Sequence, residues 1–260
     1  MLRATWAAKW YLILGLLAFL IILLVNTPIH FVWQYVERSA SGLPVRISQP
    51  AGTLWDGQAR LMTPQSGNID VHWTLSPLSL LTGTAALNLV ASGEHLNLEG
   101  EARAGGIFSG GLPETIAVSG LSGFLDGEGL SPYLMSVQTT LTGDFTLSGV
   151  NADFSLADKS LNSASGQLVY SGGRLEAPVQ RQRISTDLPM LIADVVTEGD
   201  RFLVPVKTEE GQPLGELFLQ NDGWGGVSVL KRALDVVGQP WPDKQATADT
   251  VVFEVSQKIL

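Results

Sequence analysis

The feature that most constrains this chain is an uninterrupted apolar run near its N-terminus. Residues 10–25 read WYLILGLLAFLIILLV, and no Asp, Glu, Lys or Arg occurs between Lys9 and Glu37. About 20 consecutive, mostly apolar residues allow a helix to cross the hydrocarbon core of a bilayer. We therefore predict a transmembrane anchor over residues 10–30, with these anchoring side chains: Trp10, Leu12, Ile13, Leu16, Leu17, Phe19, Leu20, Ile22 and Leu23.

A cleaved signal peptide is the alternative interpretation of this run. The run is longer than the 7–15 residues of a typical signal-peptide core, and no small-residue cleavage site follows Val25 closely. These two observations favour a retained anchor. Arg3 and Lys9 precede the run, so the positive-inside rule predicts a cytoplasmic tail over residues 1–9 and a body on the other side of the membrane.

Composition and motifs argue against several functional classes. The formal charge of −9 disfavours nucleic acid as a partner, and the absence of cysteine excludes disulfides and thiolate metal sites. His30, His72 and His95 lack the spacing of a zinc motif, and no G-x-S-x-G elbow is present. Residues 126–129 (DGEG) are better interpreted as a turn than as a cation loop. We expect no catalytic, cofactor-binding or metal-binding residues, and we do not expect an enzyme.

The body of the chain alternates apolar and polar residues as half-buried strands do. Ile69, Val71, Trp73 and Leu75 share one predicted face, and Gly, Ser, Asn and Asp interrupt such runs every 8–12 residues. A change of phase near Gly149 predicts a turn or bulge, and residues 76–83 predict a short helical turn. This pattern predicts a juxtamembrane segment over 31–44 and an elongated antiparallel β domain over 45–260, with an optional division near residue 180.

The C-terminal part combines strands with one predicted helix. Residues 202–206 and 217–219 form two predicted strands around a turn at 209–211. Apolar residues spaced as on a helix predict an amphipathic helix over 227–237, closed by Gly238. A last strand is expected over 250–256, with Val251, Phe253 and Val255 pointing inward. The expected fold is mainly β: one N-terminal transmembrane helix followed by an antiparallel sheet domain with one or two short helices.

Four tryptophans stand at predicted turns or strands, at positions 55, 73, 224 and 241. Large aromatic side chains in a β domain usually fill its core, so we expect Trp55, Trp73, Trp224 and Trp241 to be buried. The alternative is that they form an exposed patch for another protein or a lipid chain. The sequence leaves this alternative open.

Several motifs resemble protein N of the bacterial type II secretion system. These are residues 52–57 (GTLWDG), with the pattern G-T-x-W-x-G, residues 73–77 (WTLSP), residues 80–83 (LLTG) and residues 221–224 (NDGW). The resemblance follows the order of elements along essentially the whole chain. The resemblance implies structural or partner-binding roles for the residues that match the family's motifs, which are Gly52, Thr53, Trp55, Gly57, Trp73 and Trp224. We expect the first four to fix a strand turn around a buried Trp55 indole.

The resemblance implies an accessory component of the machine that exports folded proteins from the periplasm across the outer membrane. It implies a single-pass protein of the cell inner membrane with a periplasmic C-terminal domain, no cofactor, and other inner-membrane or periplasmic subunits of that system as partners. The alternative is a lipid-handling or envelope-maintenance β domain of the AsmA-like class. An open apolar groove would favour that alternative, and a solid core would favour protein contacts alone.

Overall fold

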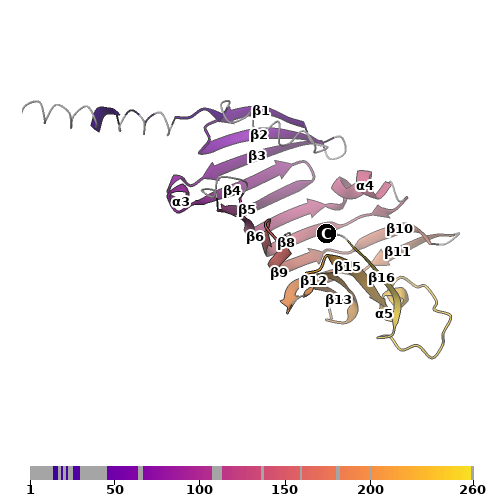
Figure 1. Cartoon of the computed structure of the whole chain (residues 1–260). Coiled ribbons are helices and arrows are strands. Elements are labelled where there is room, and N and C mark those ends of the chain that lie inside the picture. The colour runs from indigo at the N-terminus through magenta and orange to yellow at the C-terminus, as the bar shows by residue number, and fades with distance from the viewer. Residues whose placement is uncertain are drawn as a thin grey trace, which may run out of the picture.

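One long antiparallel sheet dominates the computed structural model, which describes residues 14–16, 19, 22, 26–29, 46–63, 67–106, 113–135, 138–158, 160–179, 182–199 and 201–258. Each strand of this sheet pairs with the strands that come before and after it in the sheet order, as Figure 1 shows. The thirteen strands are, in order, β1 (Arg46–Gly52), β2 (Asp56–Thr63), β3 (Gly67–Leu75), β4 (Thr84–Gly93), β5 (Leu96–Gly105), β6 (Thr115–Asp126), β8 (Asp144–Ser155), β9 (Ser160–Tyr170), β12 (Leu191–Glu198), β13 (Arg201–Thr208), β14 (Pro213–Gln220), β15 (Trp224–Leu230) and β16 (Val251–Lys258).

A small second sheet and, in the described part of residues 46–258, three short helices accompany the long sheet. The small sheet has the order β11 (Gln182–Leu188), β10 (Gly173–Val179), β7 (Thr140–Leu141). The helices are α3 (Pro77–Leu81), α4 (Gly127–Met135) and α5 (Lys231–Val236). The predicted helical turn after Ser76 is confirmed as α3, and Gly83 follows it with a φ of +78°, as a glycine after a helix commonly has.

The register of the strands joins their apolar residues into one continuous face. Residues directly opposite one another in an antiparallel pair project from the same side of the sheet. One row of such partners crosses twelve strands without meeting a polar side chain. Its members, from β2 to β16, are Ala59, Val71, Ala91, Leu98, Gly123, Leu147, Leu168, Ala193, Val206, Gly215, Val229 and Phe253. We call this side of the sheet the apolar face.

The alternation predicted from the sequence is confirmed where it was most regular. In β3 the odd-numbered residues from Ile69 to Leu75 are half-buried, whereas Asp70, His72 and Thr74 are exposed. The phase change in β8 is a β-bulge: Gly149 has a φ of +56°, and the register with β9 shifts between Ser148 and Asn151. The bulge restores the apolar residues after it to the same face.

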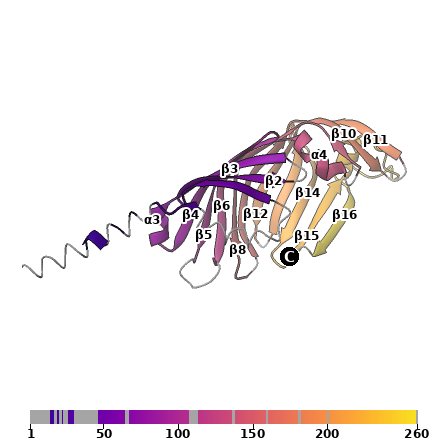
Figure 2. The ribbon, with the colours of Figure 1, turned by 90° about the horizontal axis from the view of Figure 1, so that it is seen from above.

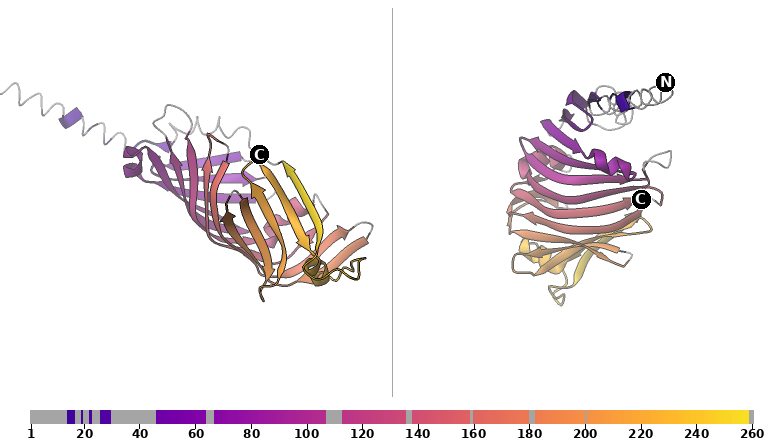
Figure 3. Two further views of the ribbon diagram at one scale, coloured as in Figure 1. Left: turned by 60° about the horizontal axis from the view of Figure 1, so that its bottom comes forward. Right: turned by 90° about the vertical axis from the view of Figure 1, so that its left-hand side faces the viewer.

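The apolar face is only partly covered. The buried apolar side chains of the described residues are few and scattered: Ile29, Ala59, Tyr170, Ala193, Phe202 and Leu214. Figures 2 and 3 show why, because the sheet twists along its length as a single layer, and β1–β3 run at a large angle to β13–β16. Among the described helices, α5 packs on β14 and β15 at the C-terminal end. Most of the apolar face is therefore half-exposed rather than enclosed in a core.

Two predictions for the C-terminal part are confirmed only in part: the helix is present but shorter, and the last strand is present but its apolar residues are exposed. Val227 and Leu230 belong to strand β15, and the helix is limited to Lys231–Val236. The spacing of these residues suits a helix, but residues 225–229 pair with both β14 and β16 and therefore form a strand. Val251, Phe253 and Val255 of the edge strand β16 lie on the apolar face but are 47–54% exposed rather than inward.

The predicted anchor lies mostly outside the described residues. Trp10, Leu12, Ile13, Leu17, Leu20 and Leu23 are outside them, whereas Leu16, Phe19 and Ile22 are helical and exposed. Within the described part of the chain, no helix has both the length and the apolar character that a membrane crossing needs.

Candidate functional site

The G-T-x-W-x-G motif forms the connection between β1 and β2. The Thr53 backbone N–H donates to the Asp56 carbonyl at 2.8 Å, and the Asp56 N–H donates to Thr53 Oγ1 at 3.1 Å. Gly52 has a φ of +91°, and a Cβ there would lie 2.5 Å from the Asp56 carbonyl oxygen. A side chain at position 52 would therefore prevent this turn from closing, which explains the first glycine of the motif.

The second glycine of the motif makes room for an indole from the next strand. Gly57 pairs with Trp73 across β2 and β3, and a Cβ at Gly57 would lie 2.7 Å from Trp73 Cε2. The Trp73 Nε1–H donates to the Leu54 carbonyl at 3.3 Å, inside the motif itself. The backbone N–H of Leu75 donates to the Trp55 carbonyl at 2.7 Å. The motif and the W-x-L-x-P segment are thus one structural unit.

This geometry corrects the expected role of Trp55. Its side chain is half-buried, and the indole that packs against the motif belongs to Trp73. The reason is the register of β2 with β3, which places Gly57 rather than any other small residue under Trp73. Gly52, Thr53, Trp55 and Gly57 lie in one turn, and the structure adds Trp73 to them, a contact that the sequence did not predict.

Trp224 is not part of this unit. It begins β15 near the other end of the sheet, after a turn in which its N–H donates to Asp222 Oδ1 at 3.2 Å. Trp224 and Trp241 are 43% and 37% exposed, so the expectation that they are buried is wrong. Trp224 pairs with Lys258 and lies on the side of the sheet opposite to the apolar face, where its side chain is exposed.

The described segment 26–29 is attached directly to the motif. Pro28 forms an isolated antiparallel bridge with Thr53, and the Leu54 N–H donates to the Thr27 carbonyl at 3.1 Å. Ile29 is buried, with 4% of its surface exposed. The motif therefore joins the C-terminal end of the apolar N-terminal segment to the first strands of the sheet.

A cavity of about 430 Å³ lies on the apolar face beside this junction. Ile29 and Leu54 line it from the motif side, and the sheet contributes Trp73, Leu75, Leu87, Leu89, Ala102 and Ile116 among others. Among the described lining residues, only Arg103 is charged, and its guanidinium is directed to Glu101, with Nε donating to Oε1 at 2.7 Å. The described side chains of the cavity therefore offer apolar contacts to a ligand and are not arranged to bind a charged group.

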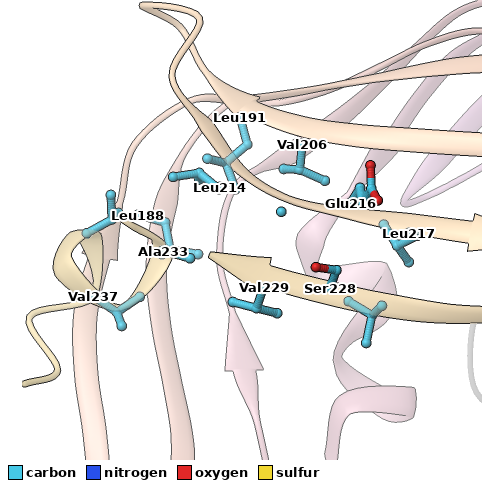
Figure 4. Close-up of a pocket in the computed structure, with 13 residues that line it drawn as sticks. Leu188, Leu191, Val206, Leu214, Glu216, Leu217, Ser228, Val229, Ala233 and Val237 are labelled. Carbon is cyan, nitrogen blue, oxygen red and sulfur yellow. The ribbon is translucent and has the colours of Figure 1, made fainter. Parts of the chain in front are cut away.

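A second, smaller cavity of about 220 Å³ lies between α5 and the sheet. Figure 4 shows Leu191, Val206, Leu214 and Ala233 gathered around it from β12, β13, β14 and α5. Sequence reasoning missed both cavities. Alternating residues indicated which side chains share a face, but alternation carries no information on whether that face is covered.

The structure also brings together three side chains that could hold a cation. His95, Asp126 and Glu128 each offer one ligand atom, and these atoms lie within 4.8 Å of one another. However, Asp126 Oδ1 accepts the N–H of Glu128 at 2.8 Å, as a residue capping the N-terminus of α4 does, and Oδ2 contacts His95 Nδ1 at 3.3 Å. A helix N-terminus favours anions. We interpret the cluster as a helix cap supported by His95.

This cap predicts a pH dependence. The Glu128 N–H, with a further contribution from His95, lowers the pKa of the Asp126 carboxyl below its usual range. The cap therefore stabilises the fold above the ordinary aspartate pKa and loses its contribution as pH falls through the lowered one. Asp126→Ala is expected to lower the unfolding midpoint at neutral pH and to differ less from the parent at acidic pH. Midpoints that differ equally at every pH would contradict this.

The motif unit, the long sheet and its apolar face define a mainly β protein in which a glycine–tryptophan turn anchors the first strands. Residues 44–237 match the family model of the type II secretion system, protein N. The chain therefore belongs to that family, and the resemblance noted in its motifs is confirmed. No curated protein and no solved structure shows detectable similarity to the chain. The family implies an accessory role in type II secretion and contacts with other components of that system.

Proposed function

We propose that this protein is an accessory component of the type II secretion system that is anchored in the inner membrane and acts through protein contacts in the periplasm. The observation that carries the proposal is the family match, which covers the sheet from β1 to α5. Its role would be to support the export of folded proteins across the outer membrane. In this proposal the protein is a structural partner and has no catalytic residue or cofactor.

Two features support the anchored arrangement. Residues 10–30 are long and apolar enough to cross a bilayer, with Arg3 and Lys9 before them and no excess of positive charge in the flank after them, which starts with Glu37 and Arg38. The hydrogen bond between Leu54 and Thr27 holds the end of that segment against the sheet. The sheet would therefore begin at the periplasmic surface of the membrane.

The edge strand β16 supports the proposed role in protein contacts. It pairs on one side with β15, and it is the last strand in the sheet order. Its exposed residues Val251, Phe253 and Val255 add apolar surface to an edge that no other described strand pairs with, a combination that suits pairing with an extended segment of a partner. On the neighbouring strand, Trp224 pairs with Lys258 and lies on the other side of the sheet from Phe253, where it adds exposed aromatic surface near the end of β16.

The proposal is tested by deleting the gene in a strain with an active type II system. We expect secreted proteins to accumulate in the periplasm and to decrease in the medium, and a plasmid copy of the full chain to restore export. In the same strain, the full chain should remain in membranes after alkaline carbonate extraction. Unchanged export kinetics without the protein would refute the accessory role, and extraction by carbonate would refute the anchor.

Photocrosslinking identifies the partner directly. A photoreactive residue at Phe253 or Trp224 of the full chain is expected to give adducts with other subunits of the secretion system, identified by mass spectrometry. A photoreactive residue at Asp70, on the polar face of β3, is the matched control and should give fewer adducts. Equal yields at all three positions would argue against a contact at the β16 edge.

A further inference from the structure

The cavity beside Ile29 has the size and lining of a site for an apolar ligand. Its volume of about 430 Å³ is within the roughly 300–1,000 Å³ of typical small-molecule sites. Its sheet side is built from aliphatic side chains and Trp73, and Arg103 is already paired with Glu101. A hydrocarbon chain would satisfy this lining, whereas a charged or strongly polar ligand would find no partner in it.

The cavity is continuous with the rest of the apolar face. Leu89 and Trp73 in the cavity are cross-strand partners, and the adjacent row of partners starts at Ala59 and Val71 and extends to Phe253. Because α5 and the residues around Ile29 each cover only a part of this face, a chain-like ligand would find apolar contact beyond the cavity.

The position of the cavity identifies the source of such a ligand. Ile29 lines the cavity and stands at the C-terminal end of the apolar N-terminal segment, which the Pro28–Thr53 bridge holds against the motif. When that segment lies in the bilayer, the cavity stands at the membrane surface, within reach of lipid acyl chains. Phospholipids are then the most abundant apolar chains at its entrance.

We propose that the apolar face receives an acyl chain of a membrane phospholipid, which enters at the cavity beside Ile29. This inference goes beyond the role in secretion and rests on the proposed anchor. Bound lipid would cover apolar side chains that the single-layer sheet leaves half-exposed. The test must distinguish this lipid from three alternative occupants of the face: a partner protein, a second copy of this chain, or the chain's own aromatic segment, residues 31–36.

The test uses the full chain reconstituted in vesicles of phosphatidylethanolamine and phosphatidylglycerol that contain phosphatidylethanolamine with a diazirine in its acyl chain. After illumination, labelled peptides are mapped by mass spectrometry. We expect label on residues 10–30 and also on peptides of β3–β6. Label on residues 10–30 alone would overturn the acyl-chain site and leave the anchor intact, whereas no label on either would refute the anchor.

A pair of variants locates the site within the sheet. Ala102→Trp places an indole in the cavity and is expected to reduce the labelling of β3–β6 several-fold relative to residues 10–30. Asn88→Trp places the same side chain on the opposite, exposed side of β4 and is expected to leave that ratio unchanged. If Ala102→Trp and Asn88→Trp lowered the relative labelling of β3–β6 equally, the proposed site would be overturned.

A photoreactive residue at Leu89 distinguishes the occupants in native membranes. We expect adducts with the mass of a phospholipid at Leu89, and none with a photoreactive residue at Asn88. Adducts of Leu89 with another protein, with a second copy, or with residues 31–36 would each overturn the proposal.

Discussion

Gly123→Ala is expected to lower the free energy of opening of β5 and β6 by roughly 3 kcal/mol, because it combines overpacking with backbone strain. Gly123 lies in the middle of β6 with a φ of +144°, a conformation that side-chain-bearing residues rarely adopt. A Cβ there would clash with the Asn97 carbonyl oxygen and would lie 2.9 Å from Leu98 Cα. Amide hydrogen exchange of peptides from these two strands measures the effect.

Gly120→Ala is the matched control for this prediction. Gly120 is in the same strand and also has a positive φ, of +62°, but nothing lies within 4 Å of a Cβ built there. The cost of the left-handed backbone alone is about 1 kcal/mol. Equal losses of hydrogen-exchange protection in Gly123→Ala and Gly120→Ala would show that the clash with β5 does not cause the destabilisation.

Trp73→Ala is expected to lower the free energy of unfolding by about 3 kcal/mol. This is the lower end for replacing a large aromatic side chain, because the indole is half-buried. The loss has three sources: the contact with Gly57, the hydrogen bond to Leu54, and the wall of the cavity. Faster hydrogen exchange should appear in β2 and β3 and in the motif that connects β1 to β2.

Trp55→Ala serves as the comparison, because Trp55 is a neighbouring tryptophan of the same unit. The Trp55 backbone carbonyl, which accepts the Leu75 N–H, is retained in the variant. We therefore expect a smaller loss than for Trp73→Ala. A larger loss for Trp55→Ala would mean that the motif depends on the Trp55 side chain after all.

Local sequence patterns predicted most of the strands and their turns. The alternation from Ile69 to Leu75, the helical turn after Ser76 and the bulge at Gly149 are all set by residues close together in the chain, and all are confirmed. The helix expected over 227–237 is confirmed only over Lys231–Val236, because the pairing of β15 with β14 and β16, a long-range interaction, makes residues 227–230 a strand. Gly226 contributes to that pairing, since a Cβ there would lie 2.6 Å from Phe218 Cζ.

The candidate site was predictable only in part. The motif identified Gly52 and Gly57 as turn residues, but which indole Gly57 accommodates depends on the register between β2 and β3. The cavity depends on Ile29 and Leu54 meeting the sheet, and no local pattern contains that contact. An open face and a covered face also have the same alternation, so the sequence could not distinguish them.

The order of the strands has a consequence for how the molecule responds to stress. Contacts in the long sheet are mainly between strands adjacent in the sheet order, so stability is approximately a sum of intrinsic and nearest-neighbour contributions, as in a repeat protein. Such a chain opens in units that begin at its ends rather than all at once. Of the two ends, β1 adjoins Thr53, which pairs with Pro28 of the N-terminal segment, while β16 has no such tether among the described residues. Unfolding should therefore begin at the C-terminal hairpins and advance toward β1.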